Sequence, residues 1–361
     1  MLLANPYLWD SSLFYLDSTD IEELQKGVQS GEPLAYYALA RYHSAVRPAS
    51  DSVEFAIELL YRAADAGVAD ATAALALLWR SGDMGIVNRE KSLQMLDEAF
   101  EHGSLLAAKV VLTDMICGIY REQDIKGAMA IIDERMSSRE DSLWCYLKGL
   151  AIHKSATASN WQQLYPQAAE WYRKAADHCV YAALDGLEEV CTQDYYGEVV
   201  DEQLRLDIIC EGCAMNYGKS ICSFANECYQ LYKYNPEQSP EGWQAQNREE
   251  LNTALSLGYA NAACCLGKSY LDDGDIESAW AYFTRGAILG SPYCYEEMHL
   301  LMQFGHVSQP EEFMELTALG GARCGSIFLM DVVVTLYRQG KLQPYAQEIE
   351  KYYLPESLDV I

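Results

Sequence analysis

The sequence lacks a long uninterrupted hydrophobic run and is poor in basic residues. No apolar stretch approaches the roughly 20 residues that span a bilayer, so no membrane segment is predicted. The chain carries 26 Lys and Arg against 53 Asp and Glu, a formal charge of −27. This balance disfavours direct binding to nucleic acid or anionic lipid, because both attract cationic surfaces. A protein partner with a basic surface is favoured instead.

The opening segment, MLLANPYLWDSSLFYLDSTD, lacks the basic start and apolar run of a secretory signal. We therefore expect a cytoplasmic location, where the 12 cysteines would be reduced thiols and not a disulfide framework. Half of the 361 residues are hydrophobic, so the chain has ample material for a core. Its length indicates either several domains or one elongated repeat array.

The second possibility is favoured by a repeat of small residues. Markers at expected helix ends recur every 30 to 40 residues, at Gly31, Gly67, Gly103, Asp141, Cys179, Gly218, Gly258, Gly290 and Gly320. The residue four after each marker is always Ala or Cys: Ala35, Ala71, Ala107, Cys145, Ala183, Cys222, Ala262, Cys294 and Cys324. The residue four before is small in eight of nine cases: Gly27, Ala63, Ala99, Ser137, Ala175, Ala214, Ala254 and Gly286, with Leu316 the exception.

Within each repeat, apolar spacing is helical on both sides of a turn. In residues 259–290, Ala262 and Leu266 lie on one helical face, Ala279 and Phe283 lie on the next, and Asp275 can cap the second helix. Each unit is therefore predicted to be a helical hairpin whose small residues let helix axes approach to about 8–10 Å. Larger residues one turn further should fill the space between hairpins: Leu39, Leu75, Val111, Leu187, Leu266, Met298 and Phe328. Gly149 and Asn226 interrupt that column, which predicts looser packing there.

The segments ALARYH, ALLWR, YRAADAG, YRKAADH and CLGKSYLDDGDIESAWAYFTRGAILG resemble Sel-one-like repeats, a branch of the tetratricopeptide-like superfamily. The family pattern is met best by Ala262, Leu266-Gly267, Tyr270, Asp272, Ala279, Gly286 and Gly290, with Gly286 standing where the family favours Ala. The resemblance covers nearly the whole chain, although repeats three, eight and nine are degenerate. It implies an all-α, right-handed solenoid of about eight to nine helix-turn-helix repeats that serves as an adaptor or scaffold.

We expect residues 1–30 to form an N-terminal cap and a first incomplete hairpin, residues 31–340 a continuous solenoid, and residues 341–361 a C-terminal cap. Terminal caps are needed because end repeats would otherwise expose an apolar face.

Signatures of catalysis are absent, since the sequence has no phosphate loop, nucleophile elbow or dinucleotide fingerprint and no HExxH. Neither an enzyme nor a cofactor is predicted. The alternative is a metal-binding or enzymatic role for Cys210, Cys213, Cys222 and Cys228, because four thiolates can bind Zn²⁺. The repeat pattern weakens this metal-binding or enzymatic alternative, since Cys222 already has a predicted packing role in the small-residue column.

Repeats four, five and six are the longest, and we attribute their length to enlarged turns. Equivalent turns stack along one edge of a solenoid, so these should form a patch. Its aromatic residues are of types enriched at binding hot spots: Trp161, Tyr165, Tyr195, Tyr196, Tyr232, Tyr234 and Trp243. Two alternatives stay open: the rings could form local cores under their own loops, or binding could use the concave face lined by the first helices.

The predicted function is a non-enzymatic scaffold or adaptor for a protein with a basic surface. A sharper version is an inhibitor or immunity-type protein that neutralises a cationic toxin or nuclease, for which the charge of −27 would speed association. The plainer version is that the acidity keeps a long solenoid soluble. The sequence leaves the oligomeric state open.

Overall fold

The computed structural model describes residues 18–46, 51–138, 141–178, 180–235, 237 and 239–354. Within these ranges the chain forms nineteen α-helices and no β-strand, apart from an isolated antiparallel bridge between Gln193 and Val199. The helices are α1 (Ser18–Ser30), α2 (Pro33–Val46), α3 (Ser52–Asp65), α4 (Ala69–Ser81), α5 (Arg89–Glu101), α6 (Leu105–Cys117), α7 (Ile125–Ser138), α8 (Ser142–Lys154), α9 (Trp161–Ala176), α10 (Ala182–Thr192), α11 (Glu202–Ala214), α12 (Gly218–Tyr234), α13 (Trp243–Ser256), α14 (Asn261–Asp272), α15 (Ile276–Ile288), α16 (Pro292–Gln303), α17 (Glu311–Arg323), α18 (Ile327–Arg338) and α19 (Ala346–Tyr352). A short 3₁₀ helix, η4 (Gln343–Tyr345), precedes α19.

Each helix packs against the next one in the chain, which makes an array of antiparallel hairpins. The first helices of successive hairpins also contact one another, in the pairs α2–α4, α4–α6, α6–α8, α8–α10, α12–α14 and α14–α16. This arrangement confirms the predicted all-α solenoid. The expected cap residues 1–17 and 355–361, and the marker Cys179, lie outside the described residues.

The hairpins are joined by a recurring left-handed turn. Five predicted marker glycines have φ between 83° and 89°: Gly31, Gly67, Gly103, Gly258 and Gly290. After each, the next backbone N–H donates to the carbonyl of the residue four before the marker, as from Val68 to Ala63 at 3.0 Å. This six-to-one hydrogen bond defines the Schellman motif, in which a glycine tolerates positive φ without a Cβ clash.

Two predicted marker glycines are wrong, and the predicted marker Asp141 is not a left-handed turn residue either, because it caps α8 with φ −116°. Gly218 is the first residue of α12 and Gly320 lies inside α17; neither has positive φ. The left-handed residues are Asn216 (φ 57°) and Gly325 (φ 95°). They make the same hydrogen bonds, from Tyr217 to the Gly212 carbonyl and from Ser326 to the Gly321 carbonyl, both at 2.9 Å. The register of repeats six and nine therefore shifts by two and five residues.

The corrected register explains where helices approach each other most closely. A Cβ placed on the residue four before the turn would lie within 2.1 to 2.6 Å of the side chain four after it: Gly27 with Ala35, Gly212 with Ser220, Gly286 with Cys294, and Gly321 with Leu329. Real Cβ atoms do not approach that closely, so a side chain at any of these positions would force its neighbour to shift. Ser220 and Leu329 thus replace the predicted Cys222 and Cys324 in the small-residue column, which makes that column less uniform than expected.

The predicted space-filling column is buried as expected at Leu39, Leu75, Val111, Leu187, Leu266 and Met298. The prediction is wrong for Phe328, because its side chain is 42 % exposed. The register shift of repeat nine places the fully buried Val333 at that position of the column. The looser packing expected at Gly149 is also wrong, because the ring of Tyr172 from α9 fills that space. A Cβ would lie 2.9 Å from this ring at Gly149 and 2.4 Å at Gly186, so both glycines hold the ring between α8 and α10.

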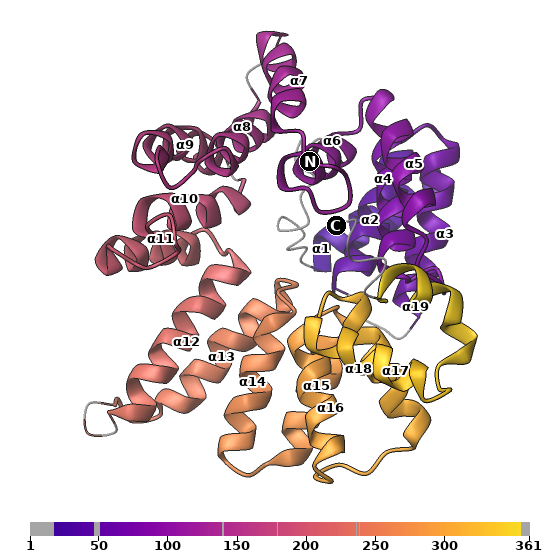
Figure 1. The fold of residues 1–361 in the computed structure, drawn as a ribbon, viewed down its shortest axis with the longest axis vertical. Coiled ribbons are helices and arrows are strands. Elements are labelled where there is room, and N and C mark those ends of the chain that lie inside the picture. Colours follow the sequence, from indigo (N-terminus) through magenta and orange to yellow (C-terminus); the bar gives the residue numbers. More distant parts are fainter. Residues whose placement is uncertain are drawn as a thin grey trace.

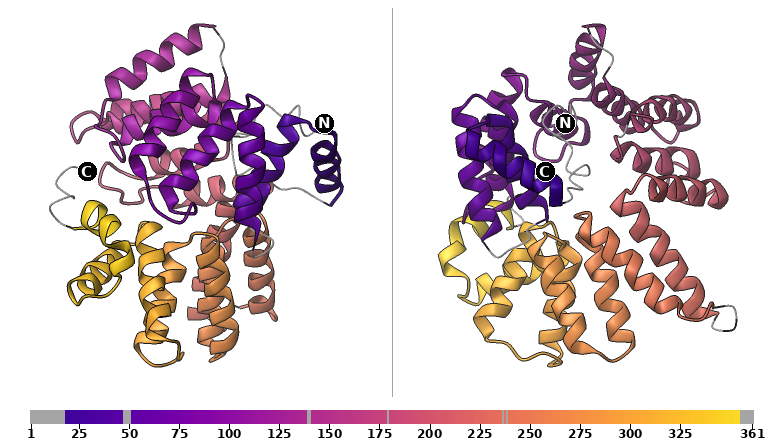
Figure 2. Two further views of the ribbon diagram at one scale, coloured as in Figure 1. Left: turned by 90° about the vertical axis from the view of Figure 1, so that its right-hand side faces the viewer. Right: turned by 180° about the vertical axis from the view of Figure 1, so that it is seen from behind.

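The solenoid closes on itself. Figure 1 shows the helices following one another around a ring, and the right view in Figure 2 places the yellow C-terminal helices beside the indigo N-terminal ones. The contact lies between α17–α19 and the turn that joins α4 to α5. From that turn, Val87 is buried in one cluster with Leu319, Val333 and Tyr353.

Polar contacts at this seam surround Val87. The Tyr352 hydroxyl accepts from the Arg89 N–H at 3.2 Å and donates to Glu90 at 3.1 Å, and the Arg89 guanidinium lies 4.4 Å from the Tyr352 ring centroid. Lys351 forms an ion pair with Glu90 at 2.5 Å. The predicted C-terminal cap segment therefore contains a helix that contacts the start of α5 as well as α18.

Candidate functional site

The enlarged turns account for only part of the extra length in repeats four to six. The α8–α9 connection, 155–160, is no longer than the α4–α5 connection, 82–88. Repeat four gains its length in α9, which has 16 residues and contains Trp161 and Tyr165. Repeat six gains length in α12, whose last turn carries Tyr232 and Tyr234, and in the following connection up to Trp243. Only in repeat five does a nine-residue connection, 193–201, account for the aromatic residues.

Trp161 and Tyr165 form a local core. Their ring centroids are 5.4 Å apart, and the Tyr165 ring also meets the buried His153 ring edge-on at 5.2 Å. Tyr165 is only 7 % exposed. Burial raises its pKa, and the nearby carboxylates of Glu189 and Asp194 act in the same direction. Asp194 belongs to the 193–201 connection, which therefore lies within electrostatic range of Tyr165 on α9.

Tyr232 and Trp243 form a second local core. The Trp243 ring lies 5.7 Å from the Tyr232 ring and 5.6 Å from that of Tyr229. The Ser239 hydroxyl donates to the Tyr232 carbonyl at 2.8 Å, which ties the connection down onto α12. Tyr234 points away from this core and is 73 % exposed. Figure 1 places the α12–α13 end at the outer edge of the ring, away from α9.

The 193–201 connection is held by hydrogen bonds among its backbone and its own side chains. One carboxylate oxygen of Asp194 accepts from the N–H groups of Tyr196 at 2.9 Å and Glu198 at 3.0 Å. The Thr192 carbonyl accepts from Val200 at 2.7 Å, and Asp201 caps α11 by accepting from Leu204 at 3.0 Å. Four hydrogen bonds thus fix a compact loop in which the side chains of Tyr195 and Tyr196 can face outward.

The loop exposes more apolar surface than the sequence alone indicated. Tyr196 is 79 % exposed and Tyr195 is 37 % exposed, with ring centroids 5.4 Å apart. Three aliphatic residues missed by sequence reasoning are also exposed: Val199 (46 %), Val200 (65 %) and Leu204 (37 %). The signal that could have found them is the apolar pair Val199-Val200 directly before the acidic helix start at Asp201-Glu202.

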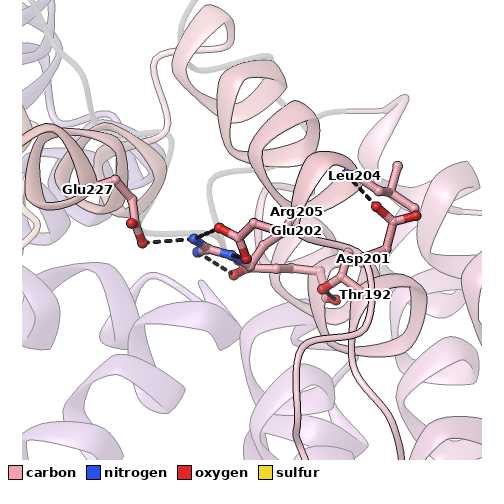
Figure 3. A network of polar contacts seen from close by, with 7 residues as sticks. Thr192, Asp201, Glu202, Leu204, Arg205 and Glu227 are labelled. Atoms are coloured by element: carbon pink, nitrogen blue, oxygen red, sulfur yellow. Dashed lines mark hydrogen bonds and ion pairs between the residues drawn. The ribbon is translucent and has the colours of Figure 1, made fainter. Parts of the chain in front are cut away.

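A charged network lies at the base of this loop (Figure 3). The Arg205 guanidinium forms ion pairs with Glu202 at 2.7 Å, Glu227 at 2.8 Å and Glu188 at 3.8 Å, which links α10, α11 and α12. Its hydrogen bond with Glu202, followed by that with Glu227, raises the Arg205 pKa above its ordinary value. One cation here faces three carboxylates, so the network itself remains negative.

The four cysteines of the metal hypothesis are not brought together as one site. The Cys222 thiol lies 3.9 Å from Cys265 on α14, to which it donates. Burial, and next the thiol of Cys210, raise the pKa of Cys213 to about 11, so Cys213 is protonated near neutral pH. Across the described residues, no three or more His, Cys, Asp and Glu side chains are arranged to hold a metal ion.

Comparison with known proteins gives structural likeness only. No family model and no curated protein matches the chain. Among solved structures, a Sel1 repeat protein from Oxalobacter formigenes is 16 % identical, with 91 % of this chain and 93 % of that chain covered and a TM-score of 0.41. The protein c5321, a protective antigen of uropathogenic Escherichia coli strains that displays an SLR fold, is 15 % identical, with 94 % and 92 % covered and a TM-score of 0.30.

The chain is an all-α helical-repeat protein, a solenoid of hairpins closed at a seam. In the part of the chain that the structure describes, none of the helices is both long enough and apolar enough to cross a bilayer.

Proposed function

We propose that this chain is a non-enzymatic cytoplasmic scaffold that binds another protein through that protein's basic surface. The observation that carries the proposal is the excess of 53 carboxylates over 26 basic residues on a helical-repeat fold, whose main feature is a large continuous surface. Such an excess attracts cationic partners over a distance and raises their association rate.

The proposed binding surface is the edge that carries the aromatic residues of repeats four to six. Its exposed members are Tyr195, Tyr196 and Tyr234, which are available to a partner without rearrangement. Trp161, Tyr165, Tyr232 and Trp243 support that edge from beneath, in the two local cores described above. The face lined by the first helices of the hairpins is the alternative surface.

The first test is capture from native lysate with the full chain, followed by kinetics on the protein that co-purifies. The expected partner is basic, and its association rate should fall at least about tenfold between about 50 and 500 mM salt, because screening shortens the Debye length. A neutral or acidic partner, or an association rate that does not change with salt, would contradict the proposal and leave solubility as the role of the charge.

The surface is tested with a triple variant, Tyr195→Ser, Tyr196→Ser and Tyr234→Ser. The matched control replaces three exposed aromatic residues elsewhere on the ring, with Tyr61→Ser, Tyr293→Ser and Phe304→Ser. We expect the first variant to weaken partner binding at least about tenfold and the control to leave it within about twofold. Equal effects of the two variants would exclude this edge and favour the face lined by the first helices.

The inhibitor or immunity-type role is a narrower form of the same proposal, and the charge of −27 is the observation that favours it. It requires that the captured partner be a cationic toxin or nuclease whose activity the chain suppresses at equal concentration. A captured partner that keeps full activity in the complex would leave the scaffold role only.

A further inference from the structure

The segment from Gln193 to Leu204 gathers exposed apolar side chains on one short stretch of backbone. Tyr195, Tyr196, Val199, Val200 and Leu204 are all large, hydrophobic and at least 37 % exposed. Soluble surfaces commonly show such residues singly, whereas a group of them rimmed by polar residues is typical of a binding site.

The segment is already ordered before any partner arrives. Asp194 and Thr192 hold the loop backbone, as described above, and Thr192 is itself fully buried, with its hydroxyl donating to the Glu188 carbonyl at 2.6 Å. Ordering a flexible loop usually reduces binding affinity, and a preformed loop avoids that cost.

The charge around these apolar residues has one sign. Between Gln193 and Leu204 the chain carries four carboxylates and no Lys, Arg or His: Asp194, Glu198, Asp201 and Glu202. The nearest cation in the sequence, Arg205, is held by three carboxylates and has a side chain only 14 % exposed. Glu202 is paired with this cation, but the four carboxylates still outnumber it. A partner approaching the loop therefore meets apolar side chains surrounded by net negative charge.

We infer that this segment is the docking site for a cationic amphipathic segment of a protein partner. The partner's aliphatic or aromatic anchors pack on Tyr196 and Val200, and its flanking Lys or Arg side chains pair with Glu198 and Glu202. This inference rests on the proposed function and specifies the chemistry of its partner. Nucleic acid and anionic lipid are repelled by the same carboxylates, and a second copy of the chain would bring two acidic rims together.

The probe is a fluorescein-labelled helical peptide built from Leu, Lys and one Trp, titrated with the full-length protein and followed by anisotropy. Two further peptides separate the contributions: one has Ser in place of Leu and Trp, and the other has Glu in place of Lys. The loop variant is Tyr196→Ser with Val200→Ser. The matched control is Tyr293→Ser with Ile327→Ser, whose parent side chains are 53 % and 78 % exposed on α16 and α18.

We expect the cationic amphipathic peptide to bind at least about tenfold more tightly than either comparison peptide, and the loop variant to lose about tenfold in affinity for it. The control should stay within about twofold of the parent chain. Circular dichroism should show unchanged helicity in both variants, since all four side chains are exposed. Equal weakening by both variants, or equal binding of the Ser-substituted peptide, would overturn the inference.

The same variants separate this inference from the proposed function. If the parent chain captures a basic partner with salt-dependent kinetics and the loop variant binds that partner equally well, the docking site is wrong and the scaffold proposal stands. If the loop variant loses the peptide but no basic partner is captured, the proposed function fails while the loop keeps its binding chemistry.

Discussion

Weakening the seam between α19 and the α4–α5 turn should open the ring without unfolding its hairpins. The perturbation is Val87→Ser combined with Tyr352→Ala. Val87 is 7 % exposed and is buried in a cluster of C-terminal residues, and Tyr352 is 9 % exposed and contacts Arg89 and Glu90. Their contacts join the first hairpins to the last, so their loss affects closure more than any single hairpin.

The expected magnitude follows from those contacts. Burying the Val87 side chain is worth about 1–2 kcal/mol. Removing the Tyr352 side chain should cost about 3–5 kcal/mol, which includes its burial and hydrogen bonds, and its contact with the Arg89 guanidinium. The exposed ion pair of Lys351 with Glu90 adds at most about 1 kcal/mol. The double variant thus removes most of the free energy that keeps the ring closed.

The assay is small-angle X-ray scattering, with circular dichroism on the same samples. The radius of gyration should rise in the double variant while helicity stays at the level of the parent chain, because repeats are stabilised mainly by their neighbours. The control, Tyr293→Ser with Ile327→Ser, changes exposed side chains that do not belong to the buried seam cluster, and it should leave the radius unchanged. An unchanged radius in the double variant would refute the reasoning, as would a loss of helicity across the whole chain.

Three further predictions concern packing and protonation. Gly186→Ala should destabilise the fold by about 1–3 kcal/mol in chemical denaturation, because its Cβ would lie 2.4 Å from the Tyr172 ring, and the effect should shrink when Tyr172→Leu is also present. Ala262→Leu should cost a similar 1–3 kcal/mol, roughly, through overpacking of a fully buried crossing, and an unchanged unfolding midpoint would contradict that placement. Burial, and next the charge of Lys154, lower the pKa of His153 to about 4. The unfolded chain therefore binds this proton first, so stability should fall as pH drops from about 6.5 to 4, and His153→Gln should reduce that fall.

The repeat could be predicted from the sequence because its cause is local. A left-handed turn and a close helix crossing both demand small residues, and these recur in the sequence at Gly67, Gly103 and Gly290. The register failed at Asn216, where a residue other than glycine adopts the left-handed turn, and at Gly325, where the nearby Gly320 offered a competing marker. In both cases the backbone hydrogen bonds, which the sequence does not display, define the turn.

The closure of the ring and the exposed loop surface could not be predicted, because both depend on contacts between segments that are not adjacent in the sequence. Closure joins Val87 to Tyr353, which are far apart in the sequence, and it depends on the accumulated curvature of every hairpin between them. The exposure of Tyr196 and the burial of Tyr165 likewise depend on how a loop folds over the neighbouring helix. The sequence identified the aromatic residues of the long repeats, but it did not show which of their side chains are exposed and which are buried in local cores.

We propose that an acidic helical ring recognises a cationic protein segment at the 193–201 connection. Zero-length crosslinking of the captured complex is the most direct test of this proposal. This chemistry joins a lysine amine to a carboxylate only where the two are in contact. The account predicts crosslinks from lysines of the partner to Glu198 and Glu202. Crosslinks that join carboxylates of the partner to lysines of this chain, with none at the loop, would contradict it.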